Sequence, residues 1–285
     1  MNVLVTGVTG QLGHDCVAEL TKRGIAVRGV SSRDFSLTDF DRAREYILSY
    51  HPDVVIHCAA YTAVDRAEEE PELCEAVNAG GTRNLAEICR QIDAKMIYIS
   101  TDYVFPGNGE DFYEPEDPKG PKNVYGRSKL HGEEAVREIL ERFFIVRISW
   151  VFGSHGNNFI RTMLRLSETH RELTVVDDQV GSPTYTKDLA VLLADMSGSE
   201  RYGVYHATNE GVCSWAELAG ETFRLSGRQV TVVPVPSSAY PTRAERPQNS
   251  RLSKDCLDRA GFARLPSWQD ALKRYLAELQ QNHMI

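Results

Sequence analysis

Tyr125 and Lys129 stand four residues apart in the segment YGRSK. The chain continues as LHGEEAVREIL, a helical pattern, so this spacing places both side chains on one face of a helix. A phenol titrates at ~10, and a neighbouring ammonium stabilises the phenolate and lowers that pKa. The pair therefore predicts a tyrosine that transfers a proton near neutral pH and a lysine that can also hold a ribose hydroxyl. By itself the motif is common, and alone it favours an ordinary structural helix.

Thr101 and Asp102 follow the apolar run KMIYIS, which is typical of a buried strand. Open α/β sheets bind ligands at the carboxyl ends of their strands, so a hydroxyl at position 101 would face the ligand crevice. Such a hydroxyl can hydrogen-bond a carbonyl oxygen and support the oxyanion that grows during hydride addition. Turn capping is the alternative for both residues. The Tyr–Lys pair favours the catalytic interpretation of Thr101.

A turn with three glycines, GVTGQLG at residues 7–13, stands between the first apolar run and a helical pattern. Gly7 would allow the tight turn, Gly10 the close approach of a pyrophosphate, and Gly13 the packing of helix against strand. Free N–H groups at the helix N-terminus would then meet the phosphates. The turn therefore predicts a dinucleotide site.

Ser31, Ser32 and Arg33 follow the second apolar run, where an NAD-preferring site carries an acidic residue. A guanidinium pairs with a 2′-phosphate, which a carboxylate would repel. We therefore predict NADPH as the cofactor, with NADH as the alternative; the competing interpretation of Arg33 is an exposed loop residue. Asp39 and Phe40 stand where they could flank the adenine, and Asp39 is equally suited to cap a helix.

Short β-branched runs alternate with helical patterns through the first half of the chain. The runs are nearly continuously apolar, as in parallel strands that are covered on both faces. They cover residues 2–7, 25–31, 53–59, 95–100 and 143–149, and the helical patterns cover residues 14–22, 39–50 and 71–92. This alternation predicts an α/β fold, a Rossmann-type doubly wound parallel sheet.

The pattern changes after about residue 155. Helices are expected at 157–170, 215–226 and 267–281, and a Pro- and Ser-rich loop at 231–250. Asn157 and Ser267 are candidate N-caps. We expect residues 1–155 to form a dinucleotide-binding domain. Residues 156–285 should form mainly a smaller substrate-binding lobe, with some segments returning to the first domain.

The composition is that of an ordinary folded chain, with 285 residues, 42% of them hydrophobic, and a net charge of −8. This charge argues against a general nucleic-acid or acidic-membrane binder, and no apolar stretch reaches the ~18 residues of a membrane span. The six cysteines form no CxxC pair and show no metal-ligand spacing, which favours reduced thiols in a cytoplasmic protein. An apolar run that starts at residue 2 leaves no room for a signal peptide.

Seven segments along the chain together resemble the dTDP-4-dehydrorhamnose reductases of the extended short-chain dehydrogenase/reductase superfamily. They are TGVTGQLG, CAAYTAVDRAEEEP, STDYVFPG, NVYGRSKLHGE, RISWVFG, GNNFIRTML and RPQNSRL. The likeness runs from residue 1 to about residue 275. It implies that a nicotinamide hydride reduces the C4 ketone of dTDP-4-dehydro-L-rhamnose to dTDP-L-rhamnose, which is used for cell-surface polysaccharide.

The resemblance implies a role for each matching site residue. Tyr125 would donate the proton, Lys129 would hold the nicotinamide ribose, and Thr101 would tune this chemistry. Thr101 and Asp102 would touch the sugar, as would Trp150, for which a core aromatic is the alternative. The implied cofactor contacts are Gly10, Gln11, Leu12, Asp39, Phe40, Ala59, Ala60 and Tyr61.

Two further residues are candidates for substrate contact. Arg246 lies in the Pro-rich loop, and its guanidinium suits the diphosphate of a nucleotide sugar, although a solvated loop is the alternative. Asn158 opens a helix that would face the sugar pocket.

Two departures from the family pattern affect the expected ligands. Ser31 or Val30 stands where family members often carry an acidic residue after the second strand, which favours NADPH over NADH. The chain ends ELQQNHMI and offers only Glu278 for the metal that bridges some family dimers. We therefore expect no metal site and leave a homodimer open.

Other activities of this superfamily are the alternatives to the implied reductase activity. Asp102-Tyr103 replaces the Asp-Glu pair with which nucleotide-sugar dehydratases follow the threonine, so dehydration is not expected. Another nucleotide-sugar 4-ketoreductase or an epimerase is an alternative, because spacing alone does not exclude it. A non-catalytic NADP-binding subunit resembling the regulatory subunit of methionine adenosyltransferase is a further one. The complete set of Thr101, Tyr125 and Lys129 favours an enzyme.

Overall fold

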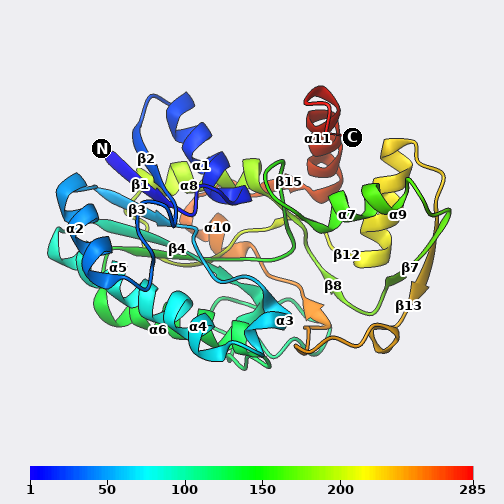
Figure 1. Ribbon diagram of the computed structural model, residues 1–285, viewed down its shortest axis with the longest axis horizontal. Helices are drawn as coiled ribbons and strands as arrows, with labels where there is room; N and C mark the ends of the chain where they lie inside the picture. The colour runs from blue at the N-terminus through cyan, green and yellow to red at the C-terminus, as the bar shows by residue number, and fades with distance from the viewer. Residues whose placement is uncertain (285) are drawn as a thin grey trace.

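A sheet of six parallel strands forms the centre of the molecule (Figure 1). The structure, a computed structural model, describes residues 1–284. The strands are β1 (Asn2–Thr6), β2 (Ala26–Val30), β3 (Val54–His57), β4 (Lys95–Thr101), β5 (Phe143–Ile148) and β10 (Gly203–His206), and their order is β10-β5-β4-β3-β1-β2. This order confirms the predicted doubly wound sheet. Because β2 and β3 lie on opposite sides of β1, a ligand crevice is expected at the carboxyl ends of β1 and β3.

Helices cover both faces of this sheet, which is why its strands are apolar on both sides. One face carries α1 (Gln11–Lys22), α8 (Thr186–Ser197) and α10 (Asp255–Ala260), and the other carries α2 (Phe40–Tyr50), α5 (Gly81–Gln91) and α6 (Val124–Ile139) (Figure 1). Successive side chains alternate between the two cores. Val3 and Val5 of β1 join the first core, and Leu4 joins the second.

The second half of the chain adds helices and small sheets to one end of the main sheet (Figure 1). The helices are α7 (Phe159–Leu166), α9 (Trp215–Ser226) and α11 (Trp268–Gln281). The small sheets are β6 (Val151–Phe152) with β9 (Thr184–Tyr185), β7 (Glu172–Val176) with β13 (Thr231–Val235), β11 (Asn209–Glu210) with β15 (Leu265–Ser267), and β8 (Val180–Gly181) between β12 (Cys213–Ser214) and β14 (Asn249–Ser250). From the same half, β10 pairs with β5 and α8 packs on α1. The division of the chain at residue 155 stays a prediction.

The structure corrects two predicted segments. The expected loop at 231–250 begins with strand β13, whose Pro234 is tolerated because a two-stranded sheet leaves its edges open. The helix expected at 71–92 is divided into α4 (Pro71–Glu75), a π-helical turn at Ala76–Gly80, and α5. This wide turn carries Asn78, whose amide bonds the backbone of Tyr61 and the hydroxyl of Ser128. A further short helix, α3 (Val64–Ala67), precedes α4.

Polar side chains cap several of the helices, and three of these caps bear on the predicted ones. Ser267 caps α11, as predicted, and Asp39 caps α2, which was one of the two interpretations of this residue. The cap of α7 is Asn158 rather than Asn157, and this helix is shorter than predicted, ending at Leu166. In each case the side-chain oxygen accepts a hydrogen bond from a backbone N–H of the first turn.

The structure bears on two expectations from the sequence, that the cysteines are reduced and that the chain contains no membrane span. All six cysteines are free, and five of them are buried. Within residues 1–284, no helix combines the length and the apolar character that a membrane crossing requires.

A buried ion pair ties α6 to the sheet. Arg147 on β5 and Glu133 on α6 are 0% and 2% exposed, and the guanidinium donates to both carboxylate oxygens, at 2.8 and 2.6 Å. Ser100 on β4 donates to the same carboxylate at 2.5 Å, and Arg147 also donates to the Pro115 carbonyl at 2.8 Å. Additional hydrogen bonds of this kind are what compensates two charges for their burial.

We expect Glu133→Gln to lower the free energy of unfolding by about 3 kcal/mol or more, because it leaves the Arg147 guanidinium buried without its counter-charge. Urea unfolding followed by circular dichroism measures this loss. Glu138→Gln is the matched control: Glu138 pairs with Arg83 on the surface, and exposed pairs contribute little. Equal losses in the two variants would contradict the special importance of the buried pair.

Candidate active site

The turn that follows β1 lies directly against the end of β3. Gly7 has a φ of +72°, and a Cβ atom at this position would lie 2.7 Å from the Ala59 amide nitrogen. A Cβ atom at Gly13 would lie 2.4 Å from the Gly7 carbonyl oxygen, because α1 packs on the turn itself. Position 7 therefore requires glycine for backbone conformation and for space, and position 13 requires it for space alone.

α1 begins at this turn, and the N–H groups of its first turn have no side-chain cap. Gly10 occupies the N-cap position and has no side chain that could accept a hydrogen bond. A helix N-terminus carries partial positive charge, and its free N–H groups bind phosphate oxygens. The glycine turn and the uncapped helix together fit the pyrophosphate of a dinucleotide.

A cavity of about 950 Å³ begins at this turn and reaches the carboxyl ends of β1 to β5. It brings together most of the residues predicted for the cofactor, namely Gly7, Gly10, Gln11, Leu12, Gly13, Ser31, Ser32, Ala59 and Ala60. The predicted catalytic and substrate residues line it as well, namely Thr101, Asp102, Tyr125, Lys129, Trp150, Asn158 and Arg246. Residues that are distant in the sequence therefore share one cavity.

Four residues predicted for the cofactor do not line this cavity. Arg33 is exposed, and Asp39 caps α2. Phe40 is 45% exposed, and the Tyr61 hydroxyl donates to Glu70 at 2.8 Å. Their contacts with a cofactor stay predictions.

The start of α6 is held by the loops around it. Asn123 caps the helix by accepting from the Gly126 N–H at 2.8 Å, and its amide donates to the Glu245 carbonyl at 2.8 Å. A Cβ atom at Gly126 would lie 2.4 Å from the Tyr103 carbonyl oxygen, so the helix packs tightly on the residues that follow β4. These contacts place Tyr125, the residue before Gly126, at the wall of the cavity.

Tyr125 and Lys129 lie one turn apart on α6, as predicted, but the expected pKa effect is reversed. Lys129 donates to the Ile99 carbonyl at 2.7 Å, and its Nζ lies 4.1 Å from the centroid of the Tyr98 ring. Burial lowers the pKa of Lys129 to about 7. Burial also raises the pKa of Tyr125, and a hydrogen bond with Thr101 acts in the opposite direction. The predicted lowering of the phenol pKa is wrong in this structure, because loss of hydration penalises both charged forms.

Asp102 is a buried carboxylate held by two hydroxyl groups. Thr101 donates to its Oδ1 at 2.9 Å, and Ser250, on β14, donates to its Oδ2 at 2.5 Å. Burial raises the pKa of Asp102 to about 6, and the two hydroxyl groups oppose this rise because they bond the ionised form. Asp102 therefore changes charge near pH 6.

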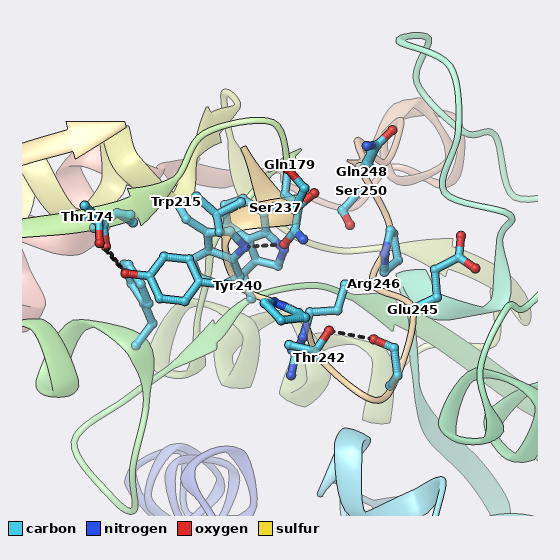
Figure 2. Close-up of a pocket in the computed structure, with 18 of the residues that line it drawn as sticks. Thr174, Gln179, Trp215, Ser237, Tyr240, Thr242, Glu245, Arg246, Gln248 and Ser250 are labelled. Carbon is cyan, nitrogen blue, oxygen red and sulfur yellow. Dashed lines mark hydrogen bonds between the residues drawn. The ribbon is translucent and has the colours of Figure 1, made fainter. Parts of the chain in front are cut away.

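A second cavity, of about 1130 Å³, adjoins the first (Figure 2). The two cavities share the side chains of Tyr103, Trp150, Phe159, Trp215 and Arg246. The indole rings of Trp150 and Trp215 stack with their centroids 3.7 Å apart and their planes at 15°. The Trp215 indole N–H donates to Gln179 at 3.2 Å, as Figure 2 shows. The stack gives the second cavity a rigid aromatic wall.

Trp150 and Arg246 stand where the two cavities join. Trp150 has a φ of +50°, which is strained for a bulky side chain, and such strain gathers at functional sites. Arg246 donates to Asp65 at 2.6 Å, so this guanidinium is oriented by a carboxylate on α3 rather than free in a solvated loop. Both side chains therefore have defined positions at the junction.

Among the residues that were not predicted for the site, three make contacts that shape it. Trp215 was recognised only as the start of a helix, Ser250 lies in the segment RPQNSRL, and Asp65 lies in the segment CAAYTAVDRAEEEP. The resemblance of these two segments to the family was the only indication in the sequence that Ser250 and Asp65 belong to the site. No spacing rule pairs either residue with its partner.

Three residues of the types that bind metal ions lie close together, on α1 and on the segment before α7. His14, Asp15 and His155 offer ligand atoms within 4.8 Å of one another. The imidazole rings stack at 3.3 Å between centroids with their planes at 21°, so their nitrogen lone pairs lie in two stacked planes, an arrangement that does not favour a shared metal ion. Asp15 already accepts from the Thr186 hydroxyl at 2.5 Å. The prediction that the chain has no metal site stays a prediction.

Comparison with known proteins places these features in a family. Residues 1–281 match the family described as the RmlD substrate binding domain. The dTDP-4-dehydrorhamnose reductase of Streptomyces griseus is 44% identical to this chain, over 94% of this chain and 91% of that protein. The spore coat polysaccharide biosynthesis protein SpsK of Bacillus subtilis is 41% identical over 97% of each chain.

Solved structures agree with this result. The crystal structure of dTDP-4-dehydrorhamnose reductase from Bacillus anthracis in complex with NADP is 39% identical to this chain, with a TM-score of 0.94. The match covers 97% of this chain and 99% of that one. The chain therefore belongs to the dTDP-4-dehydrorhamnose reductase family.

Proposed function

We propose that this protein uses NADPH to reduce the C4 ketone of dTDP-4-dehydro-L-rhamnose and so produces dTDP-L-rhamnose. The observation that carries the proposal is the junction of the two cavities. The first cavity contains the glycine turn together with Thr101, Tyr125 and Lys129, and it shares a wall with the second. A nucleotide cofactor and a nucleotide sugar can therefore meet beside the Tyr125 phenol. Membership of the reductase family supports this assignment.

The first cavity binds the cofactor. The glycine turn and the uncapped N–H groups of α1 hold the pyrophosphate, and Lys129 holds the nicotinamide ribose. Ser32 and Arg33 recognise the 2′-phosphate. When bound, NADPH supplies the hydride. The protein's own contribution is positioning and charge stabilisation.

Tyr125 donates the proton that the C4 oxygen requires after hydride addition. Because burial raises the pKa of this phenol, the group is protonated at neutral pH, as a proton donor must be. The Thr101 hydroxyl also hydrogen-bonds this phenol, and by turning its O–H from Asp102 to the substrate it stabilises the same developing oxyanion.

The second cavity binds the sugar nucleotide. Arg246, where the two cavities join, pairs with the diphosphate, and Asp102, in the first cavity, accepts a hydrogen bond from a sugar hydroxyl. The Trp150–Trp215 stack provides an apolar wall. Because most of this cavity is built by elements beyond residue 155, we assign residues 156–285 mainly to substrate binding.

The setting of the reaction follows from composition. Free cysteines support a cytoplasmic location. The net charge of −8 argues against a general nucleic-acid or acidic-membrane binder, so binding of the anionic sugar nucleotide depends on local basic groups such as Arg246. A homodimer stays a prediction.

We expect NADPH oxidation that depends on added dTDP-4-dehydro-L-rhamnose. Tyr125→Phe should lower kcat by about 10²- to 10⁴-fold, because it removes the general acid. The decline in NADPH absorbance measures turnover, and a cofactor titration should show unchanged NADPH binding. Tyr50→Phe is the control, because Tyr50 lines neither cavity. Absence of turnover with both NADPH and NADH, in protein that binds cofactor, would overturn the proposed reaction.

The kcat/KM for the sugar should fall as the pH drops through about 6, because protonation of Asp102 removes the acceptor for the sugar hydroxyl. Ser250→Ala removes a hydrogen bond to the ionised form of Asp102, so the acid limb should move to higher pH by about one unit. Initial rates across a pH series measure this shift. Ser226→Ala, at the end of α9, is the matched control. An acid limb that does not move in Ser250→Ala would show that another group causes it.

We expect Arg33→Ala to raise the KM for NADPH about tenfold and to leave the KM for NADH unchanged, because the lost bond is to the 2′-phosphate alone. Arg83→Ala, an exposed arginine on α5, is the control. Initial rates with each cofactor make the comparison. Equal changes for NADPH and NADH would show that Arg33 does not select the cofactor.

A further inference from the structure

The segment between β6 and α7 lies against the start of α1. Gly156 has a φ of +76°, and a Cβ atom there would lie 3.6 Å from the Gln11 Cγ. Two residues later, the Asn158 amide donates to the Gln11 Oε1 at 2.9 Å. Gln11 is the first residue of α1, and both residues line the first cavity. A side chain of the second half of the chain therefore contacts the glycine turn directly.

The orientation of the Asn158 amide is determined by α7. Its Oδ1 accepts from the Arg161 N–H at 3.0 Å and so caps the helix. The Nδ2 must then face the opposite way, toward Gln11, the Gly153 carbonyl at 2.9 Å and the Tyr275 hydroxyl at 3.0 Å. An asparagine amide has two N–H donors, and these acceptors already engage both. Neither N–H group of the amide is left to bind a sugar.

The contact also determines the orientation of the Gln11 amide. A carboxamide is planar, with its acceptor oxygen and its NH₂ group on different sides. Because Asn158 holds the oxygen, the Gln11 Nε2 is turned away from Asn158. Within residues 1–284, no hydrogen bond engages this Nε2. Its two N–H groups are therefore free at the same helix end whose backbone N–H groups are uncapped.

The C-terminal helix supports the same arrangement. The Tyr275 side chain on α11 is fully buried, and its hydroxyl donates to the Gly153 carbonyl at 3.0 Å while it accepts from Asn158. The position of Asn158 is thus set by α7 and α11, both outside the dinucleotide turn.

We propose that Asn158 is a positioning residue for cofactor binding: it orients the Gln11 amide so that Gln11 donates to the pyrophosphate of NADPH. This inference rests on the proposed function in one respect, the identity of the bound dinucleotide. It assigns Asn158 to the cofactor, whereas the sequence suggested contact with the sugar. It also makes cofactor affinity depend on the second half of the chain.

A double-mutant cycle on NADPH binding, measured by titration calorimetry without any sugar, tests the proposal. Asn158→Ser keeps a good N-cap for α7 but has no donor that reaches Gln11. We expect it to raise the Kd for NADPH about fivefold. In a Gln11→Ala background the same substitution should have no further effect, because the group that it orients is absent. The Kd for dTDP should not change in Asn158→Ser.

Asn282→Ser, at the exposed end of α11, is the control and should leave both Kd values unchanged. The thermal unfolding midpoint of each variant shows that it is folded. An unchanged Kd for NADPH, or an equal increase in both backgrounds, would overturn the role of Asn158. If the Kd for dTDP rose and the Kd for NADPH did not, Asn158 would be a substrate-binding residue and the proposal would be wrong. A wild-type protein that binds no NADPH would overturn the proposed function itself, which separates the two failures.

Discussion

The buried carboxylate of Glu133, on α6, is bound by Ser100 of β4 and Arg147 of β5. These hydrogen bonds compensate its burial, so the carboxylate must stay in contact with both strands. A bidentate guanidinium–carboxylate pair tolerates little change in direction, unlike an apolar contact, which permits small slides and rotations. Glu133 lies on the same helix as Tyr125 and Lys129, at successive intervals of four residues, so all three share one helical face. Because the ion pair anchors Glu133 to β4 and β5, it also fixes the position of this helical face relative to the sheet. The distance between the Tyr125 phenol and Thr101, at the end of β4, depends on that position.

The remaining geometry of the site depends on contacts between the two halves of the chain. Ser250 holds Asp102 across 148 residues of sequence, and Arg246 holds Asp65 across 181. Both donors belong to the segment that encloses the second cavity, and both acceptors belong to the segments that follow strands of the main sheet. The pocket and the reacting groups are therefore oriented by the same bonds.

Local patterns predicted what depends on local structure. The glycine turn, the spacing of Tyr125 and Lys129, and the apolar runs of the sheet follow from rules that act over a few residues, and the structure has these elements where expected. The stack of Trp150 on Trp215 and the bond from Ser250 to Asp102 join distant segments, and no periodicity records such pairing. The reversed pKa effect at Tyr125 has the same origin, because spacing on a helix does not reveal how deeply a phenol and an ammonium are buried. Strand β13 was missed because its proline and its neighbours resemble a loop, whereas its partner β7 lies in another part of the chain.

The order of elements along the chain also has a consequence for synthesis. α1 is among the first elements to be made, yet the helix that covers it, α8, spans residues 186–197, and the edge strand β10 follows at 203–206. At about 5–20 residues per second, roughly 9 to 35 seconds separate the appearance of α1 from that of α8. During this interval α1 is the only one of the three helices on that face of the growing sheet that has been made. A nascent chain of this protein thus offers chaperones a defined window, which closes only when about seven tenths of the sequence has been made.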